Sequence, residues 1–88
     1  MKFIQDSIYQ PQMTMRRISV FTTNIGYVKD VATVIEALNK VYPEFKVNVD
    51  MEDCDRILRV ESQNEIIDAI EIIKIVKEKG FECGVLDD

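Results

Sequence analysis

Residues 45–65, FKVNVDMEDCDRILRVESQNE, decide the fold. Apolar and polar residues alternate in the first part, and a period of two buries one face of a β-strand while it leaves the other in water. The apolar positions are Phe45, Val47, Val49 and Met51. The acidic run at 50–55 is typical of a hairpin tip, and in the return strand at 56–61 Leu58 and Val60 share the buried face. The middle of the chain is therefore predicted to be a β-hairpin with one buried face.

Upstream of this hairpin, the sequence predicts a strand and then a helix. Residues 17–23, RISVFTT, are rich in β-branched and aromatic residues and favour a strand that ends before Gly26. The helix is expected from Tyr27 to Tyr42, because apolar residues recur there at spacings of three and four and Pro43 disfavours helical backbone in the residue before it.

Downstream, Ser62 and Glu65 have the spacing of an S-x-x-E capping box, which predicts the start of a second helix. Gly80 favours the left-handed backbone that ends helices, so the helix is expected to end near residue 79. The core-facing stripe is expected to consist of Ile66, Ala69, Ile70, Ile73 and Val76. Ile72 and Ile75 lie off that stripe and are expected on the surface. Residues 81–85 alternate again and predict a short last strand.

The resulting order of elements, βαββαβ, is typical of an α+β fold of the ferredoxin-like kind. We expect a four-stranded antiparallel sheet in the order 4-1-3-2, with both helices on one face. The domain is expected to span residues 15–88, preceded by an N-terminal extension at 1–14. The apolar residues of that extension have two explanations: they cover the sheet, or translation starts later, at Met13 or Met15.

Charge and composition limit the partners and the compartment. The chain has 88 residues, with 11 Lys plus Arg, 16 Asp plus Glu and a net charge of −5. Nucleic acid and anionic membranes attract clustered cations, so neither is an expected partner. No apolar run approaches the ~20 residues of a membrane-spanning helix, and the first residues do not resemble a signal peptide. A cytoplasmic protein with reduced thiols is expected.

The residues that most enzymes depend on are missing. The chain has no His, which removes the commonest general base and imidazole metal ligand. Its three glycines are too scattered for a phosphate-binding loop. Cys54 lies among carboxylates, which stabilise the protonated form of a thiol, the opposite of what a nucleophilic cysteine needs. Cys83 is expected to point into the core. We therefore expect no enzyme, no cofactor and no resident metal.

Residues 23–31, TNIGYVKDV, resemble the T-N-I-x-C-x-x-C-V loop of heavy-metal-associated domains, the copper-chaperone-like family. Residues 47–60 are similar to the second and third strands of that family, and residues 79–83 to its closing turn. The resemblance covers residues 16–86 and implies the same ferredoxin-like fold. The family's two metal-binding cysteines fall on Tyr27 and Asp30, and neither a phenol nor a carboxylate replaces a thiolate for soft monovalent copper. The resemblance thus implies a degenerate member without the metal-binding pair.

A second, weaker resemblance is to ligand-sensing regulatory domains of the ACT type, which have the same topology. In this topology the loop after the first strand, the hairpin tip and the turn before the last strand lie at one end of the molecule, here called the loop end. Tyr27, Cys54 and Phe81 would then be neighbours at this loop end. The alternative function is a small-molecule or metal-sensing domain that binds its ligand there.

Surplus apolar residues support a different function, protein contact. If Phe21 faces the helices, then Ile18 and Val20 point to the open face of the sheet, where Ile57 joins them. With Ile72 and Ile75 on the second helix, these residues form a candidate interface. The leading hypothesis is a non-enzymatic interaction module that contacts another protein or its own copy as a homodimer.

Overall fold

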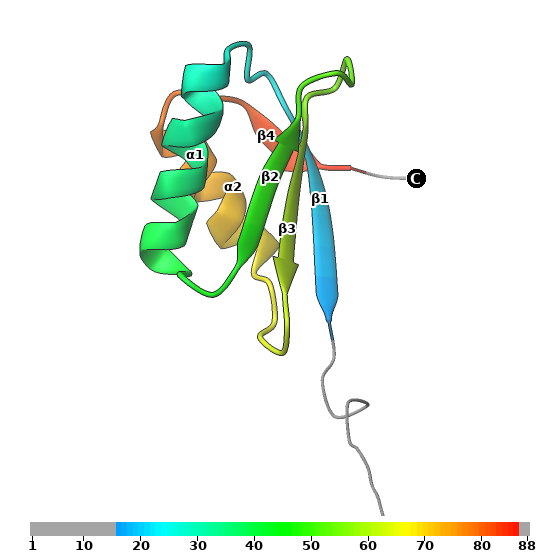
Figure 1. The fold of residues 1–88 in the computed structure, drawn as a ribbon, viewed down its shortest axis with the longest axis vertical. Helices are drawn as coiled ribbons and strands as arrows, with labels where there is room; N and C mark the ends of the chain where they lie inside the picture. The colour runs from blue at the N-terminus through cyan, green and yellow to red at the C-terminus, as the bar shows by residue number, and fades with distance from the viewer. Residues whose placement is uncertain (1–15, 87–88) are drawn as a thin grey trace, which may run out of the picture.

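The structure, a computed structural model, describes residues 16–86 and contains the six predicted elements in the predicted order. These elements are β1 (Arg17–Thr23), α1 (Val28–Val41), β2 (Lys46–Asp50), β3 (Ile57–Ser62), α2 (Ala69–Glu78) and β4 (Cys83–Val85). The strands form one antiparallel sheet in the order β2-β3-β1-β4, which is 4-1-3-2 read from the other edge, and both helices cover one face (Figure 1). The ferredoxin-like fold is confirmed, while the predicted extension at 1–14 lies outside the described residues.

The core lies between the sheet and the helices. Its fully buried side chains come from every layer: Phe21, Leu58 and Val60 from the sheet, Val34 and Leu38 from α1, and Ile72 and Val76 from α2. Burial of each such side chain stabilises the fold by about 1.5–3 kcal/mol. Cys83 is also buried, as its strand parity predicts. The inward residues of the hairpin are those that the alternating sequence pattern indicates.

The connection from α1 to β2 is closed by polar contacts. The Asn39 side-chain amide donates hydrogen bonds to the carbonyls of Tyr42 and Phe45, at 3.1 and 2.9 Å. The Phe45 N–H donates to the Tyr42 carbonyl at 3.1 Å, and the two rings stack with centroids 4.5 Å apart. Because Pro43 stops the helix, these contacts fix the direction in which the chain enters β2.

Helix α2 begins later than predicted, and Asp68 rather than Ser62 is its N-cap. The Asp68 carboxylate accepts hydrogen bonds from the N–H groups of Ile70 and Glu71, at 3.1 and 3.2 Å. Ser62 is instead the last residue of β3, opposite Arg17, and its hydroxyl donates to the carbonyl of Glu65. The capping-box prediction is wrong because the ladder with β1 keeps Ser62 in the sheet.

The predicted surface positions Ile72 and Ile75 are wrong as well. Their side chains are 0% and 6% exposed, whereas Ile66 and Ile70, which were assigned to the core, are 76% and 79% exposed. The predicted stripe counted Ile66 as helical, but that residue precedes the Asp68 cap. The buried face of α2 centres on Ile72 and Val76, so that Ala69 and Ile73 lie at its border and Ile70 turns outward.

Two backbone features complete the fold. Gly80 has a φ of 98°, the left-handed conformation that was predicted to end α2. Arg56, at the end of the β2–β3 hairpin tip, has a φ of 47°. Among residues 16–86, neither helix is long and apolar enough to cross a lipid bilayer.

Candidate functional site

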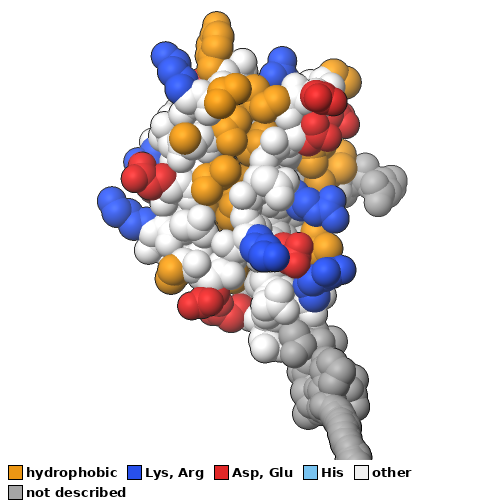
Figure 2. Space-filling view, in the orientation of Figure 1, with side chains coloured by type: hydrophobic (Ala, Val, Ile, Leu, Met, Phe, Trp, Pro, Cys, Tyr) orange, Lys and Arg blue, Asp and Glu red, His pale blue; other side chains and the backbone are white. Residues whose placement is uncertain are grey.

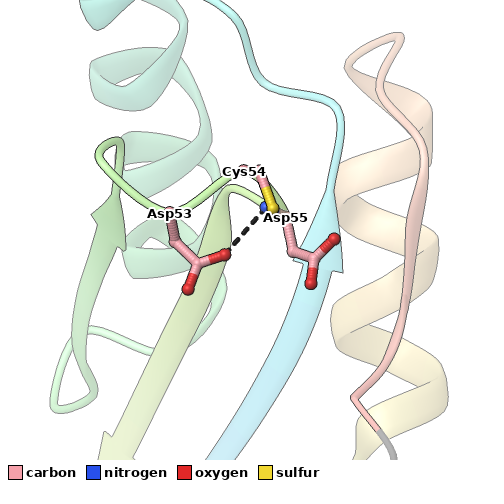
Figure 3. Close-up of side chains that lie close together, drawn as sticks. All are labelled: Asp53, Cys54 and Asp55. Carbon is pink, nitrogen blue, oxygen red and sulfur yellow. Dashed lines mark hydrogen bonds between the residues drawn. The ribbon is translucent and has the colours of Figure 1, made fainter.

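The hairpin tip between β2 and β3 brings one thiol and two carboxylates together. One ligand atom each of Asp53, Cys54 and Asp55 lies within 4.8 Å of the others, and all three residues are exposed (Figure 3). The Asp53 carboxylate accepts the N–H of Asp55 at 2.8 Å, and the Asp53 carbonyl accepts the N–H of Arg56 at 2.9 Å. Asp53 therefore shapes the turn. A soft thiol beside hard carboxylates does not match the donor set that holds monovalent copper.

The three loops of the predicted loop end do meet. The Thr23 N–H donates to the Asp55 carbonyl at 3.1 Å, and the Thr23 hydroxyl donates to the Arg56 carbonyl at 2.7 Å. The Asn24 side-chain oxygen accepts the N–H of Glu82 at 2.8 Å. These contacts tie the loop after β1 to the hairpin tip and to the segment before β4.

The three side chains named for that loop end have different surroundings. Tyr27 is 68% exposed and Cys54 is exposed, whereas Phe81 is half-buried and packs against the core. The Lys29 ammonium lies 5.9 Å from the centre of the Tyr27 ring, within reach of a cation–π interaction. The structure thus brings the loops together, but Phe81 serves the core.

The two positions that correspond to the family's cysteines begin helix α1. Tyr27 is the N-cap residue and makes no side-chain capping bond, while its carbonyl accepts the N–H groups of Asp30 and Val31 at 3.0 and 3.2 Å. Asp30 lies in the first turn, where a negative charge interacts favourably with the helix dipole. Both residues therefore have local roles in starting the helix.

The open face of the sheet is less apolar than predicted. Ile18 is 40% exposed, and Val20 and Ile57 are half-buried. The register places Glu61 opposite Ile18 and Arg59 opposite Val20. Side chains of directly opposite residues share a face, so the predicted apolar strip alternates with charges. The parity of β1 was predicted correctly, but of the neighbours from β3 only Ile57 was considered, and not the charged Glu61 and Arg59.

Sequence reasoning missed an apolar groove beside β1. The groove has a volume of about 320 Å³ and is lined by residues 18–21 of β1, by Ala69 and by Val85 and Leu86. It exists because β4 is short: β4 pairs with β1 along Phe21–Thr23, and the Leu86 N–H then donates to the Val20 carbonyl at 3.1 Å. Within residues 16–86, no strand continues beside the first part of β1 on this side.

A second feature that sequence reasoning missed is the free edge of β2. Among residues 16–86, the sheet has no strand beyond β2. Apolar side chains gather between α1 and β2 on the face shown in Figure 2. Val31 of α1, Val47 and Val49 of β2, and Met51 just after β2 are half-buried and pack against the core. The sheet order 4-1-3-2 already places β2 at an edge, so this feature was available to sequence reasoning.

A polar depression lies around β4. It has a volume of about 430 Å³ and is lined by Thr22, Thr23, Lys77, Glu82, Cys83 and Gly84. The hydroxyls of Thr22 and Thr23 already donate to the carbonyls of Gly84 and Arg56. Burial raises the pKa of the Cys83 thiol to about 11, and the nearby positive charge of Lys77 lowers it by less. This thiol stays protonated at neutral pH and is a poor nucleophile.

Comparison with known proteins adds no relative: no family model matches the chain, and neither a curated protein nor a solved structure matches it. The fold and the surfaces described above define an α+β ferredoxin-like domain. The resemblance of the Thr23–Val31 loop to heavy-metal-associated domains stays a prediction.

Proposed function

We propose that this chain is a non-enzymatic protein-contact module and that its own copy is one of its partners. The observation that carries the proposal is the amount of apolar side chain that the core leaves outside. Val28, Ile66 and Ile70 are 77%, 76% and 79% exposed, and half-buried apolar side chains border the free edge of β2. Single exposed apolar residues are common, but half-buried apolar side chains on an unpaired strand, such as Val47 and Val49 of β2, favour contact with another chain.

The reactive groups of the described residues support a non-enzymatic function. The chain has no His, the Cys83 thiol is buried and protonated, and the Asp53 carboxylate is engaged in its own turn. The degenerate heavy-metal-associated loop, with Tyr27 and Asp30 at the cysteine positions, fits the same proposal, because it lacks the soft thiolates that would carry copper.

We further infer a cytoplasmic location. Cys54 and Cys83 are free thiols in the structure, and free thiols are typical of reducing compartments. The ligand-sensing alternative at Tyr27, Cys54 and Phe81 has less support, because Phe81 is packed against the core.

Light scattering coupled to size exclusion tests the proposed self-association. We expect the mean mass of the full chain to rise from 10.2 kDa toward twice that value as the protein concentration is raised. A constant monomer mass at every concentration would contradict self-association. Chemical shifts recorded over the same dilution series show which surface is involved.

A further inference from the structure

We propose that two copies of this chain join edge to edge through β2, antiparallel and about a two-fold axis at Asn48. This inference rests on the proposed function and specifies the surface and register of the self-contact. The backbone groups of β2 point alternately toward β3 and away from it. In an antiparallel ladder each residue directs its N–H and C=O to the same side, and the sides alternate along the strand.

The contacts of Phe45 show which residues of β2 face outward. The Phe45 N–H donates to the Tyr42 carbonyl, and the Phe45 carbonyl accepts from the Asn39 side chain, so both groups of Phe45 point away from β3. By alternation, Val47 and Val49 also direct their backbone groups away from β3. Among residues 16–86 no strand lies on that side to receive them. Such an edge is a template for another strand.

The same hydrogen bonds limit the register. Because the outward carbonyl of Phe45 is occupied by Asn39, the new strand can pair from Val47 onward. A two-fold arrangement centred on Asn48 places Val47 opposite the partner's Val49, and Val49 opposite the partner's Val47. Both are hydrogen-bonded pairs, so all four outward groups of each copy find a partner. Asn48 then lies opposite the partner's Asn48.

Charge complementarity selects this register and the second copy as the occupant. Lys46 and Asp50 flank the outward residues and are both exposed on the open face of the sheet. With the axis at Asn48, Lys46 lies opposite the partner's Asp50, and Asp50 opposite the partner's Lys46. Opposite charges in directly opposed positions stabilise a strand pair, and like charges destabilise it. A parallel arrangement would place Lys46 beside the partner's Lys46.

The side chains on the other face also suit this contact. Val47 and Val49 point toward the helix layer and are half-buried against the core. Asn39 reaches Phe45 from α1, so its face of α1 lies over the β2 edge. Ile35, one turn earlier on the same face, is half-buried. Pairing of two β2 edges would bring these apolar groups of both copies together and remove them from water.

Charge reversal tests the register. In Lys46→Asp or Asp50→Lys alone, both cross-strand pairs of the dimer become repulsive, and we expect the dimer dissociation constant to rise about tenfold or more. A mixture of the two variants restores two attractive pairs, so it should form a heterodimer that is more stable than the homodimer of either variant. The double variant Lys46→Asp/Asp50→Lys should again form a homodimer. Native mass spectrometry distinguishes these species.

The matched control is Arg59→Glu, which makes the same change of charge on the open face of β3, a strand with neighbours on both sides. It should leave the dimer intact. Asp50 also accepts the N–H of Glu52 at 3.0 Å, so circular dichroism must show that each variant is folded. If the single variants dimerise as the parent chain does, or if Arg59→Glu dissociates the dimer equally, the β2 interface is wrong.

Cysteine cross-linking tests the axis independently of charge. In a Cys54→Ser background, Asn48→Cys places two thiols at a non-hydrogen-bonded pair, where Cα atoms are ~4.5 Å apart and a disulfide can form. Arg59→Cys, opposite Asn48 on β3, places the thiols on strands that are not adjacent in the dimer. We expect rapid oxidation to a covalent dimer for the first and little for the second. Dimers without this difference would overturn the β2 register and leave the proposed self-association standing, whereas a monomer mass throughout would overturn both.

Discussion

Burial gives Cys83 a property that a solution experiment can detect. Its pKa is raised from 9.0 to about 11, mainly because burial penalises the thiolate. The folded chain therefore holds this proton to higher pH than the unfolded chain does. Burial also raises the pKa of Tyr42, and the negative charges of Glu71, Asp68 and Glu65 raise it further. Both groups therefore make the folded chain less stable as the pH rises through their pKa values.

The free energy of unfolding should consequently fall on the alkaline side. The contribution of Cys83 is fully present below pH 9.0 and is lost as the pH rises toward 11. We expect a loss of about 1–2 kcal/mol from this thiol, measured by urea unfolding at pH 8 and at pH 10.5. Cys83→Ala should show a smaller alkaline loss than the parent chain. An equal loss in both proteins would contradict the assignment to Cys83.

The N-cap of helix α2 is Asp68 in the structure, whereas the sequence pattern predicted Ser62. Asp68 accepts two N–H groups at the helix start, whereas Glu65 of the predicted capping box precedes it. Asp68→Ala should lower the free energy of unfolding by about 1 kcal/mol, because two N–H groups lose their acceptor. Glu65→Ala is the matched control and should change it by less than half as much. Urea denaturation of both variants decides, and equal losses would argue against Asp68 as the cap.

Two alanine variants of α2 test which face of the helix is buried. Ile72 is 0% exposed and Ile70 is 79% exposed, although the two residues differ by only two positions. Ile72→Ala should lower the free energy of unfolding by about 2–5 kcal/mol, since it leaves a cavity in the core. Ile70→Ala should stay within about 0.5 kcal/mol of the parent chain. Thermal and urea unfolding measure the free energy of unfolding of both variants. A large loss for Ile70→Ala would show that Ile70 lies on the buried face of α2, as the sequence pattern predicted.

For the whole molecule, the order of elements and the sheet order were predictable from local patterns. Alternation in residues 45–51 and the three-and-four spacing of α1 each depend on one element and its nearest neighbours. The phase of α2 was not predictable in this way, because the pairing of Ser62 with Arg17 decides where β3 ends. That contact joins residues far apart in sequence, so a local capping pattern cannot report it.

The candidate surfaces were also predictable only in part from local sequence patterns. The sides to which Ile18 and Val20 point follow from strand parity, but the charges of Glu61 and Arg59 beside them follow from the register of β1 with β3. The groove beside β1 depends on the length of β4, which the alternating residues 81–85 overestimated. The free edge of β2 was implied by the predicted topology, and its significance became apparent from the contacts of Phe45.

The hydrogen bond from Leu86 to Val20 has a mechanical consequence. It places the two ends of residues 16–86 at the same end of the β1–β4 ladder, with β4 running antiparallel to β1. Tension applied through these ends loads the ladder like a zipper, so that its bonds break one after another, beginning with Leu86. Because these hydrogen bonds carry the load one at a time, we expect this region to unfold at a low force when it is pulled through these ends, with β4 detached first.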